Sequence, residues 1–254
     1  MTTLLTGAGL PIPGTPSFKP GQLSGLIAWY DAQDISTITQ SGGLVSQWSD
    51  KSPKGLNVAQ STASNRPTYS ATAFNGAKPA VVFGHGEITD IWLEAPQVPA
   101  TSIRDFTAFY ALSISSNGGY QTVYGLGGYG DDVDIAMIDN GFSDKRLYQV
   151  LYCNAEDPGD VSASNRLGET ASFYGVTQRA SGAVTFRANG IADAAGPQAQ
   201  SPGVDGFTES ITYLGGDGGE VLNGGLGEFI LYNRALSPAE IAQVEAYLAA
   251  RWGL

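Results

Sequence analysis

The chain has 254 residues, of which 13 are Lys or Arg, 24 are Asp or Glu and one is His, so its formal net charge is −11. This balance argues against nucleic-acid binding through clustered cations and against electrostatic attachment to an anionic membrane. Glycine accounts for 34 residues and charged residues for only 15% of the chain, a composition typical of short strands and tight turns.

Residues 1–21 are predicted to form an extended N-terminal arm. Four prolines and four glycines are spaced through this segment, and such a sequence suits neither a helix nor a central strand. The arm is either a disordered leader or a segment that docks on a partner or a neighbouring subunit. The candidate docking residues are Leu10, Pro11, Ile12 and Pro13.

Targeting and metal-binding signals are sparse along the chain. The first residues contain neither the basic segment nor the apolar core of a signal peptide, and no stretch approaches the roughly 18 apolar residues of a transmembrane helix. We therefore expect cytoplasmic synthesis without membrane insertion. The single cysteine, Cys153, excludes an internal disulfide and a Cys-based zinc site, and the single histidine, His85, disfavours most His-containing metal centres and a Ser-His-Asp triad.

Residues 22–254 are predicted to form one all-β sandwich. Apolar or alternating runs between turn residues mark the expected strands. These runs lie at 26–30, 79–83, 105–112, 147–153, 171–179, 183–188, 211–214 and 226–232. The pairs Ser181-Gly182 and Asn189-Gly190 predict tight turns on either side of the 183–188 strand, because glycine and asparagine tolerate the positive φ that such turns need.

The clearest helical pattern covers residues 237–252. Ser237 stands at the N-cap, Pro238 at the first helical position and Glu240 at the third, which is a capping box. Apolar residues then recur at spacings of three and four, which predicts one apolar stripe against the sandwich. The stripe consists of Ile241, Val244, Leu248 and Trp252, and Gly253 is expected to end the helix.

Several segments resemble the laminin-G-like domains of the concanavalin A-like lectin/glucanase superfamily. The matching text is GLIAWYDAQDISTITQSGGLVSQWSD at 25–50, NRPT at 65–68, NGAKPAVVF at 75–83 and GEFILYNRALS at 227–237. The resemblance implies a concanavalin A-like jelly-roll sandwich with a closing helix. It leaves the function open, because this fold carries lectins, hydrolases, adhesion modules and structural domains.

Two tryptophans and three aspartates stand out in the opening segment. Trp29 and Trp48 are predicted to be core residues, with a sugar-binding platform as the alternative. Asp31, Asp34 and Asp50 are expected to make hydrogen bonds within turns and to the backbone.

The spacing of carboxylates argues against a hydrolase. The resemblance includes endoglucanases whose catalytic strand resembles E-x-D-x-x-E, and retaining hydrolysis needs two carboxylates about 5 Å apart. The nearest residues here are Glu87, Asp90 and Glu94, at spacings of three and four. Because side chains alternate along a strand, Glu87 would point away from the other two, and we predict no catalysis. His85 is expected to be a loop residue and Cys153 an inert thiol.

The segment 117–132 has the composition of a carbohydrate site. Sugars need an aromatic face and a few planar polar groups, and this stretch combines tyrosines and glycines with acidic residues. The predicted ligand-binding residues are Tyr120, Gln121, Tyr124, Tyr129, Asp131 and Asp132. The alternative is that the tyrosines fold back on the sandwich.

The same region contains the densest acidic cluster. Asp131, Asp132 and Asp134 are candidate calcium ligands, because calcium takes several carboxylate and carbonyl oxygens from a loop. A solvated acidic loop is the alternative. A second candidate consists of Asp217, Glu220 and Asn223.

The sequence as a whole predicts a non-catalytic recognition or adhesion module that binds carbohydrate on a cell surface. The resemblance, together with the arm and the missing export signal, implies display on a bacteriophage-type virion, at its tail or capsid surface. One alternative is a structural decoration protein that its arm anchors to other virion proteins or to copies of itself. The other is a glycoside hydrolase.

Overall fold

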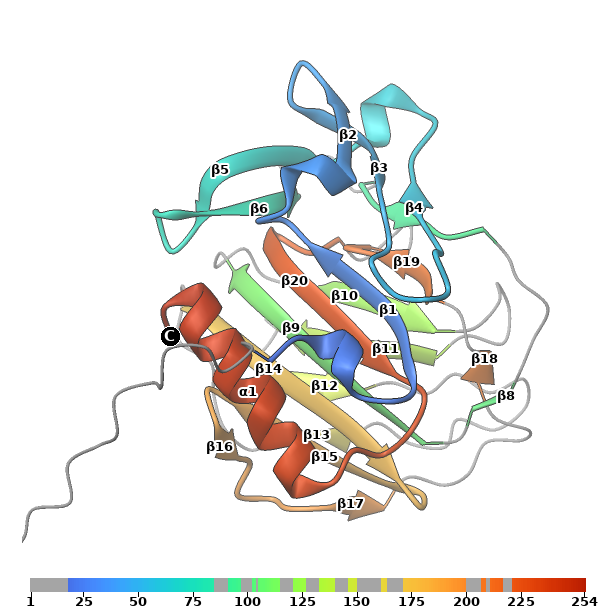
Figure 1. The fold of residues 1–254 in the computed structure, drawn as a ribbon, viewed down its shortest axis with the longest axis vertical. Coiled ribbons are helices and arrows are strands. Elements are labelled where there is room, and N and C mark those ends of the chain that lie inside the picture. The colour runs from blue at the N-terminus through green and yellow to red at the C-terminus, as the bar shows by residue number, and fades with distance from the viewer. Residues whose placement is uncertain are drawn as a thin grey trace, which may run out of the picture.

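The structure is a computed structural model of the chain, whose elements are mainly antiparallel strands (Figure 1). The described residues are 18–84, 91–96, 102–103, 105–114, 121–126, 133–139, 146–149, 161–163, 171–199, 207–208, 211–216 and 221–254. Some short stretches, among them 133–139 and 146–149, are described by their backbone only.

One layer, the helix-side sheet, has a long strand at its centre. In spatial order its strands are β1 (Leu26–Asp31), β20 (Gly224–Tyr232), β9 (Phe106–Ile114), β14 (Ala171–Ala180) and β15 (Ala183–Ala188), and the short β16 (Ile191–Ala192) and β17 (Gln198–Ala199) both pair with β15. The central β9 is buried along almost its whole length. This burial explains why its sequence is apolar at successive positions rather than alternating.

The second layer, the far sheet, packs against the first. Its strands in order are β4 (Val58–Ala59), β7 (Leu93–Glu94), β19 (Ile211–Leu214), β10 (Thr122–Leu126), β11 (Val133–Asp139), β12 (Arg146–Gln149) and β13 (Val161–Ser162).

Further strands join the two layers at one end. They are β2 (Ile38–Ser41), β3 (Leu44–Trp48), β5 (Thr68–Phe74) and β6 (Lys78–Phe83), and β6 pairs with the first residues of β20. Two short 3₁₀ helices, η2 (Ile35–Thr37) and η3 (Ala63–Asn65), precede β2 and β5. Strand β8 (Ser102–Ile103) pairs separately with β18 (Phe207–Thr208).

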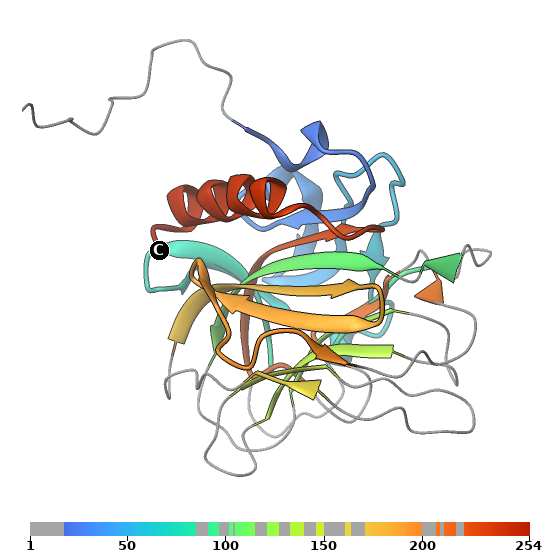
Figure 2. The same ribbon diagram turned by 90° about the horizontal axis from the view of Figure 1, so that it is seen from below.

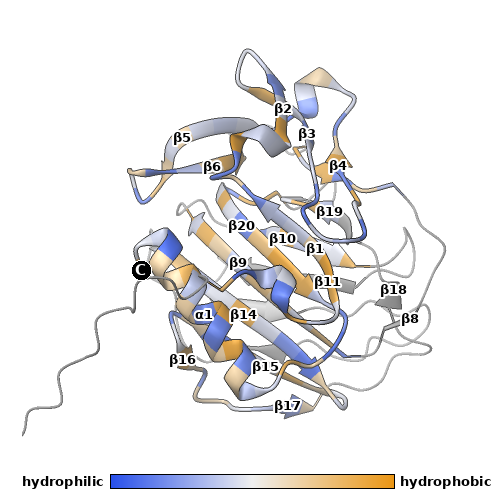
Figure 3. Cartoon of the chain, in the orientation of Figure 1, coloured by the Kyte–Doolittle hydropathy of each residue, from blue (hydrophilic) through white to orange (hydrophobic). Residues whose placement is uncertain are grey.

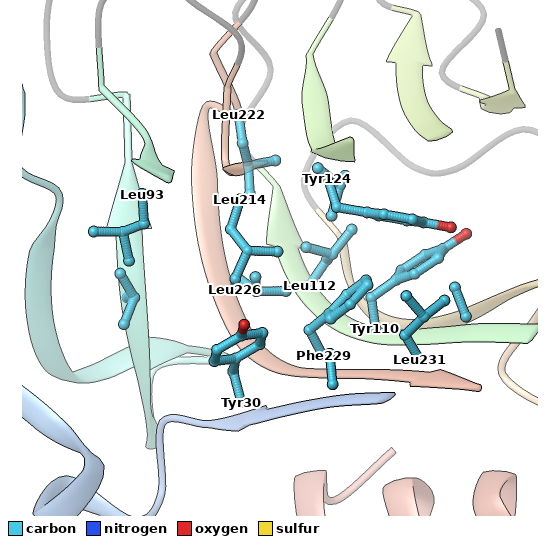
Figure 4. Packing of buried hydrophobic residues seen from close by; sticks show 14 of the residues in the cluster. Tyr30, Leu93, Tyr110, Leu112, Tyr124, Leu214, Leu222, Leu226, Phe229 and Leu231 are labelled. Carbon is cyan, nitrogen blue, oxygen red and sulfur yellow. The ribbon is translucent and has the colours of Figure 1, made fainter. Parts of the chain in front are cut away.

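The main hydrophobic core lies between the two sheets. Figure 4 shows Tyr30, Tyr110, Tyr124 and Phe229 within it, and all four are fully buried. The ring centroids of Tyr124 and Phe229 are 4.6 Å apart, and the hydroxyl of Tyr110 shares a 3.0 Å hydrogen bond with Thr177 Oγ1. A slip of any of these strands by one residue would turn its aromatic side chains away from the core, so the packing fixes the register.

The α-helix α1 (Pro238–Trp252) covers the outer face of the helix-side sheet (Figure 2). Figure 3 shows apolar and polar residues along the helix, and its apolar side chains belong to one buried cluster with residues of β9, β14 and β20. A Cβ at Gly227 would lie 2.5 Å from the ring of Trp252, so the absent side chain lets the indole lie on the sheet. Among the described residues, no helix combines the length and the hydrophobicity needed to cross a membrane.

The structure confirms the predicted all-β sandwich with a C-terminal helix. Ser237 Oγ accepts a hydrogen bond from the backbone of Glu240, and Gly253 ends the helix with φ 72°. The predicted turns also form: Ser181 and Asn189 adopt φ 51° and 47°, each followed by a glycine with positive φ. Residues 171–180 and 183–188 form the expected hairpin.

The predicted arm is too long by at least four residues. The ring centroids of Phe18 and Tyr247 are 6.2 Å apart, and Tyr232 donates a 2.9 Å hydrogen bond to the carbonyl of Pro20. The short 3₁₀ helix η1 (Pro20–Gln22) therefore belongs to the folded body. Residues 1–17, with the candidate docking residues Leu10, Pro11, Ile12 and Pro13, lie outside the described residues.

Candidate functional site

All four tryptophans lie within the described residues, and three of them are buried while one is partly exposed. Trp48 and Trp252 are fully buried and Trp29 is only 9% exposed, which confirms the core interpretation of Trp29 and Trp48. Trp92 is partly exposed. A large aromatic ring at the surface is an unusual placement when three others are buried, so the surroundings of Trp92 form the first candidate site.

Trp92 directly precedes strand β7 and lies on the same side of the chain as Glu94. Ile91, Leu93 and Ala95 point into the core between the sheets and are at most 5% exposed, whereas Glu94 is exposed. Because side chains alternate along an extended chain, Trp92 and Glu94 lie on the outer surface of the far sheet, with their Cα atoms ~7 Å apart.

A neighbouring loop fixes a guanidinium near this strand. Gln60 Nε2 donates to the carbonyl of Trp92 at 3.4 Å, and the carbonyl of Gln60 accepts from Arg66 Nε at 2.8 Å. Arg66 Nη2 also donates to the carbonyl of Ser61 at 2.9 Å. These backbone bonds hold the half-buried arginine, which has no acidic partner among the described residues. We call the set Arg66, Trp92 and Glu94 the β7 patch.

The next strand of the far sheet lies beside this surface, and its Tyr213 is only 7% exposed. Glu94 pairs with Ala59 of β4 on one side and with Tyr213 of β19 on the other. Tyr213 in turn pairs with Gly125 of β10, where an added Cβ would overlap the tyrosine ring. Gly125 thus leaves the space that the ring of Tyr213 occupies.

Two of the predicted ligand residues are in the wrong environment for that role. Tyr124 is fully buried and Gln121 is 2% exposed. The segment 122–126 forms strand β10 rather than an open loop, and Tyr124 points into the core between the sheets (Figure 4). The prediction that these two side chains bind a ligand at the surface is therefore wrong, and the alternative of a tyrosine folded back on the sandwich holds for Tyr124.

Most of the other predicted site residues lie outside the described side chains. Tyr120, Tyr129, Asp131, Asp132, His85, Glu87, Asp90, Cys153, Asp217 and Glu220 fall outside the described residues. Asp134 is described by its backbone, which pairs with Gly125, and the backbone N–H of Asn223 donates to Gln121 Oε1 at 2.9 Å. Within the described ranges, no three His, Cys, Asp or Glu residues are grouped as a metal site would require, so calcium binding remains a prediction.

Two buried carboxylates form a second cluster, beneath α1. Asp31 and Glu228 are cross-strand partners on β1 and β20, and they are 1% and 0% exposed. Glu228 accepts hydrogen bonds from Trp29 Nε1 at 2.7 Å, from the Tyr247 hydroxyl at 2.7 Å and from Trp252 Nε1 at 2.8 Å. Burial, followed by the negative charge of Asp31, raises the pKa of Glu228 to about 7.

Cationic side chains of the protein surround Asp31, the other carboxylate of this pair. Asp31 Oδ2 lies 2.6 Å from Arg251 Nη2 and 2.9 Å from Lys51 Nζ, and Arg251 Nε lies 3.4 Å from Glu228. Because helix α1 and its donors cover both carboxyl groups, this pair anchors the helix and offers no access to a substrate. The sequence signal for this cluster is Glu228 within the apolar sequence GLGEFILY, because a charge that is buried among apolar residues requires partners.

The remaining aspartates of the opening segment behave largely as expected. Asp50 accepts hydrogen bonds from the backbone N–H groups of Trp29, Ser52 and Leu56 at 2.8 to 2.9 Å. Asp34 accepts from Ser36 Oγ and pairs with Lys51. These bonds organise the loop that covers β1.

Comparison with known proteins gives fold neighbours only. No protein-family model matches the chain, and no curated protein matches its sequence. Among solved structures, a Trypanosoma rangeli sialidase is similar with a TM-score of 0.55 at 15% identity over 94% of this chain and 36% of the sialidase. A structure titled for the ganglioside-dependent cell entry of botulinum neurotoxin type C gives a TM-score of 0.59 at 12% identity, over 88% of this chain and 51% of that one.

One neighbour matches as a complete domain. Domain 4 of AbnA, a GH43 extracellular arabinanase from Geobacillus stearothermophilus solved with arabinotriose, has a TM-score of 0.56 at 13% identity. The match covers 87% of this chain and 98% of that domain, whereas this chain spans about a third of the sialidase. At these identities the likeness establishes a shared fold, which in these neighbours occurs in proteins of carbohydrate recognition and cleavage.

Proposed function

We propose that this protein is a non-catalytic recognition module that binds carbohydrate on a cell surface through the β7 patch. The observation that carries the proposal is the partial exposure of Trp92 while the other three tryptophans are buried. Sugar rings present C–H groups that pack on aromatic faces, and their hydroxyls pair with planar polar groups. Trp92 supplies the face, and Arg66 and Glu94 supply a donor and an acceptor beside it.

One fold neighbour and the covered carboxylates support this proposal over a hydrolase. The arabinotriose complex concerns a domain that this chain matches almost completely. Asp31 and Glu228 pair across adjacent strands, as two glycosidase carboxylates could, but α1 covers them and protein donors occupy their oxygens. The β7 patch contributes one carboxylate, Glu94, and retaining hydrolysis needs two.

The experiment is a glycan array that includes bacterial surface polysaccharides, read with calcium and with EDTA, and with an assay for reducing ends. The wild type is expected to bind saturably without cleavage, and Trp92→Ala to lose binding by at least tenfold. Ile191→Ala is the matched control, because Ile191 is a 68% exposed apolar side chain on β16. Trp92→Tyr, which keeps an aromatic ring, is expected to retain part of the affinity.

Two results would contradict the proposal. Release of reducing ends by the wild type would favour a hydrolase. Unchanged affinity in a folded Trp92→Ala protein would remove the β7 patch as the binding site. Loss of binding in EDTA would instead support calcium at the acidic segment containing Asp131, Asp132 and Asp134.

We further propose display on the surface of a bacteriophage-type virion after cytoplasmic synthesis, with residues 1–17 attaching the domain to other virion proteins or to further copies. The favouring observation is the packing of Phe18 and Pro20 against Tyr247 and Tyr232, which ties the start of the body to α1. A purely structural decoration protein is the second candidate function. Deleting residues 1–17 is expected to abolish incorporation into particles and leave thermal stability unchanged, and full incorporation of the truncated protein would refute attachment by this segment.

A further inference from the structure

We infer that Glu94 makes the β7 patch selective for neutral oligosaccharides over those carrying carboxylated sugars. The inference rests on the proposed function and adds the class of ligand. Glu94 is exposed on the same side of β7 as Trp92, with the two Cα atoms ~7 Å apart. A sugar packed on the indole would therefore lie within reach of the carboxylate.

A carboxylate at this distance distinguishes hydroxyl groups from acidic groups. Its oxygens only accept hydrogen bonds when ionised, so they can pair with the hydroxyls of a neutral sugar. A ligand carboxylate has no proton to give near pH 7 and is repelled by Glu94. The same residue thereby both holds the neutral ligand and rejects the acidic one.

Arg66 could attract a ligand carboxylate and so offset its repulsion by Glu94, but hydrogen bonds to the backbone restrain the guanidinium. Its Nε and one Nη2 hydrogen are directed at the carbonyls of Gln60 and Ser61. The edge of the guanidinium that would form the side-on bidentate pair with a carboxylate is thus occupied by backbone. The end-on edge, with Nη1 and the second Nη2 hydrogen, is left to donate to ligand hydroxyls or to a ligand carboxylate.

Several other described cations are engaged away from the patch. Arg187 pairs with Glu245, Arg234 with Glu240 and Arg251 with Asp31, while Lys51 bridges Asp31 and Asp34. The formal net charge of the chain is −11. The long-range field therefore adds to the repulsion of an anionic ligand.

The effect expected from one exposed charge is modest but measurable. Two unit charges about 7 Å apart change a binding constant by about threefold in bulk water and by about tenfold where the effective dielectric constant falls to about 35, and salt reduces the effect. The wild type is thus expected to bind a neutral glycan about threefold to tenfold more tightly than its counterpart with a terminal carboxylated sugar.

The test uses matched glycan pairs that differ only by a terminal sialic acid or uronic acid, titrated at low and at high salt. Glu94→Gln is expected to bring the ratio of affinities for neutral and acidic members close to one. High salt is expected to narrow the ratio in the wild type.

The matched control removes a carboxylate from the other layer of the sandwich. Asp105 is a partly exposed residue directly before β9 of the helix-side sheet, and its Oδ1 accepts a 2.8 Å hydrogen bond from the backbone N–H of Ser181. Asp105→Asn keeps an oxygen that can accept this bond and loses the charge. It changes the net charge by the same amount as Glu94→Gln and is expected to leave the affinity ratio unchanged.

The outcomes separate the inference from the function on which it rests. A wild type that prefers the acidic members, or a Glu94→Gln protein with the wild-type ratio, overturns the selectivity while carbohydrate binding stands. An equal loss of selectivity in Asp105→Asn would assign the effect to net charge and overturn the role of Glu94. A wild type that binds neither member of any pair overturns the proposed function, and the selectivity falls with it.

Discussion

The buried carboxyl of Glu228 predicts an inverted pH dependence of stability. Its pKa in the folded protein is about 7, against 4.5 for an ordinary glutamate. Between these values the folded state binds more protons than the unfolded state, so the free energy of unfolding increases as the pH falls. The contribution is fully present below about pH 4.5 and is lost as the pH rises through 7.

The magnitude follows from the two pKa values. Lowering the pH from about 7.5 to about 5 is expected to add about 2 kcal/mol to the free energy of unfolding, which raises the melting temperature by roughly 4 to 8 °C in a domain of this size. Glu240, whose pKa the hydrogen bond from Arg234 lowers to about 2, titrates outside this window. Its stabilising effect is lost only below about pH 4.5.

The measurement is urea unfolding at half-unit steps across this pH range, for the wild type and for Glu228→Gln. The glutamine is similar in shape and cannot ionise, whereas every other titrating group is shared by the two proteins. The wild type is expected to gain stability over Glu228→Gln as the pH falls. Parallel pH profiles for the two proteins would refute the assignment of this titration to Glu228.

Two further predictions concern packing and ion pairing, each measured by urea unfolding. Gly175→Ala is expected to destabilise the protein by about 1 to 3 kcal/mol, because a Cβ there would overlap the buried ring of Tyr110; Gly21→Ala, where nothing lies within 4 Å, is the control, and equal effects would contradict the reasoning. Arg187→Ala is expected to cost about 2 kcal/mol, since it removes the pair of 2.9 Å bonds to the 6% exposed Glu245. A cost below about 0.5 kcal/mol would mean that solvent already screens this ion pair.

The elements that the sequence predicted well are those whose signals are local. The capping box at Ser237 and the Asn189-Gly190 turn each depend on residues within a few positions of one another, and both form as expected. The apolar run of β9 likewise indicated that this strand lies in the middle of the sandwich.

Elements that depend on distant partners were missed. Glycines around β10 suggested an open loop, but Gly125 is there because the ring of Tyr213, from a strand much later in the chain, occupies the space of its side chain. Asp31 and Glu228 meet only through the pairing of β1 with β20. The apolar sequence around Glu228 signals a buried charge that needs partners, but no pattern within either segment identifies the strand that supplies them.

Only part of the candidate site could be predicted from the sequence. The alternation of Ile91, Leu93 and Ala95 with Trp92 and Glu94 is a readable strand signal, but it does not say which side of a two-layered fold is covered. The burial of one face by the core, and the placement of the loop at Gln60 beside the other, required the structure.

Helix α1 and the β7 patch lie on opposite faces of the sandwich. The start of the folded body packs on this helix through Phe18 and Tyr247. The β7 patch lies on the outer surface of the far sheet, with two layers of strands between it and the helix. A partner that bound beside Phe18 and α1 would therefore contact the opposite layer of the sandwich from the β7 patch, and the face with Trp92 would stay open to a ligand.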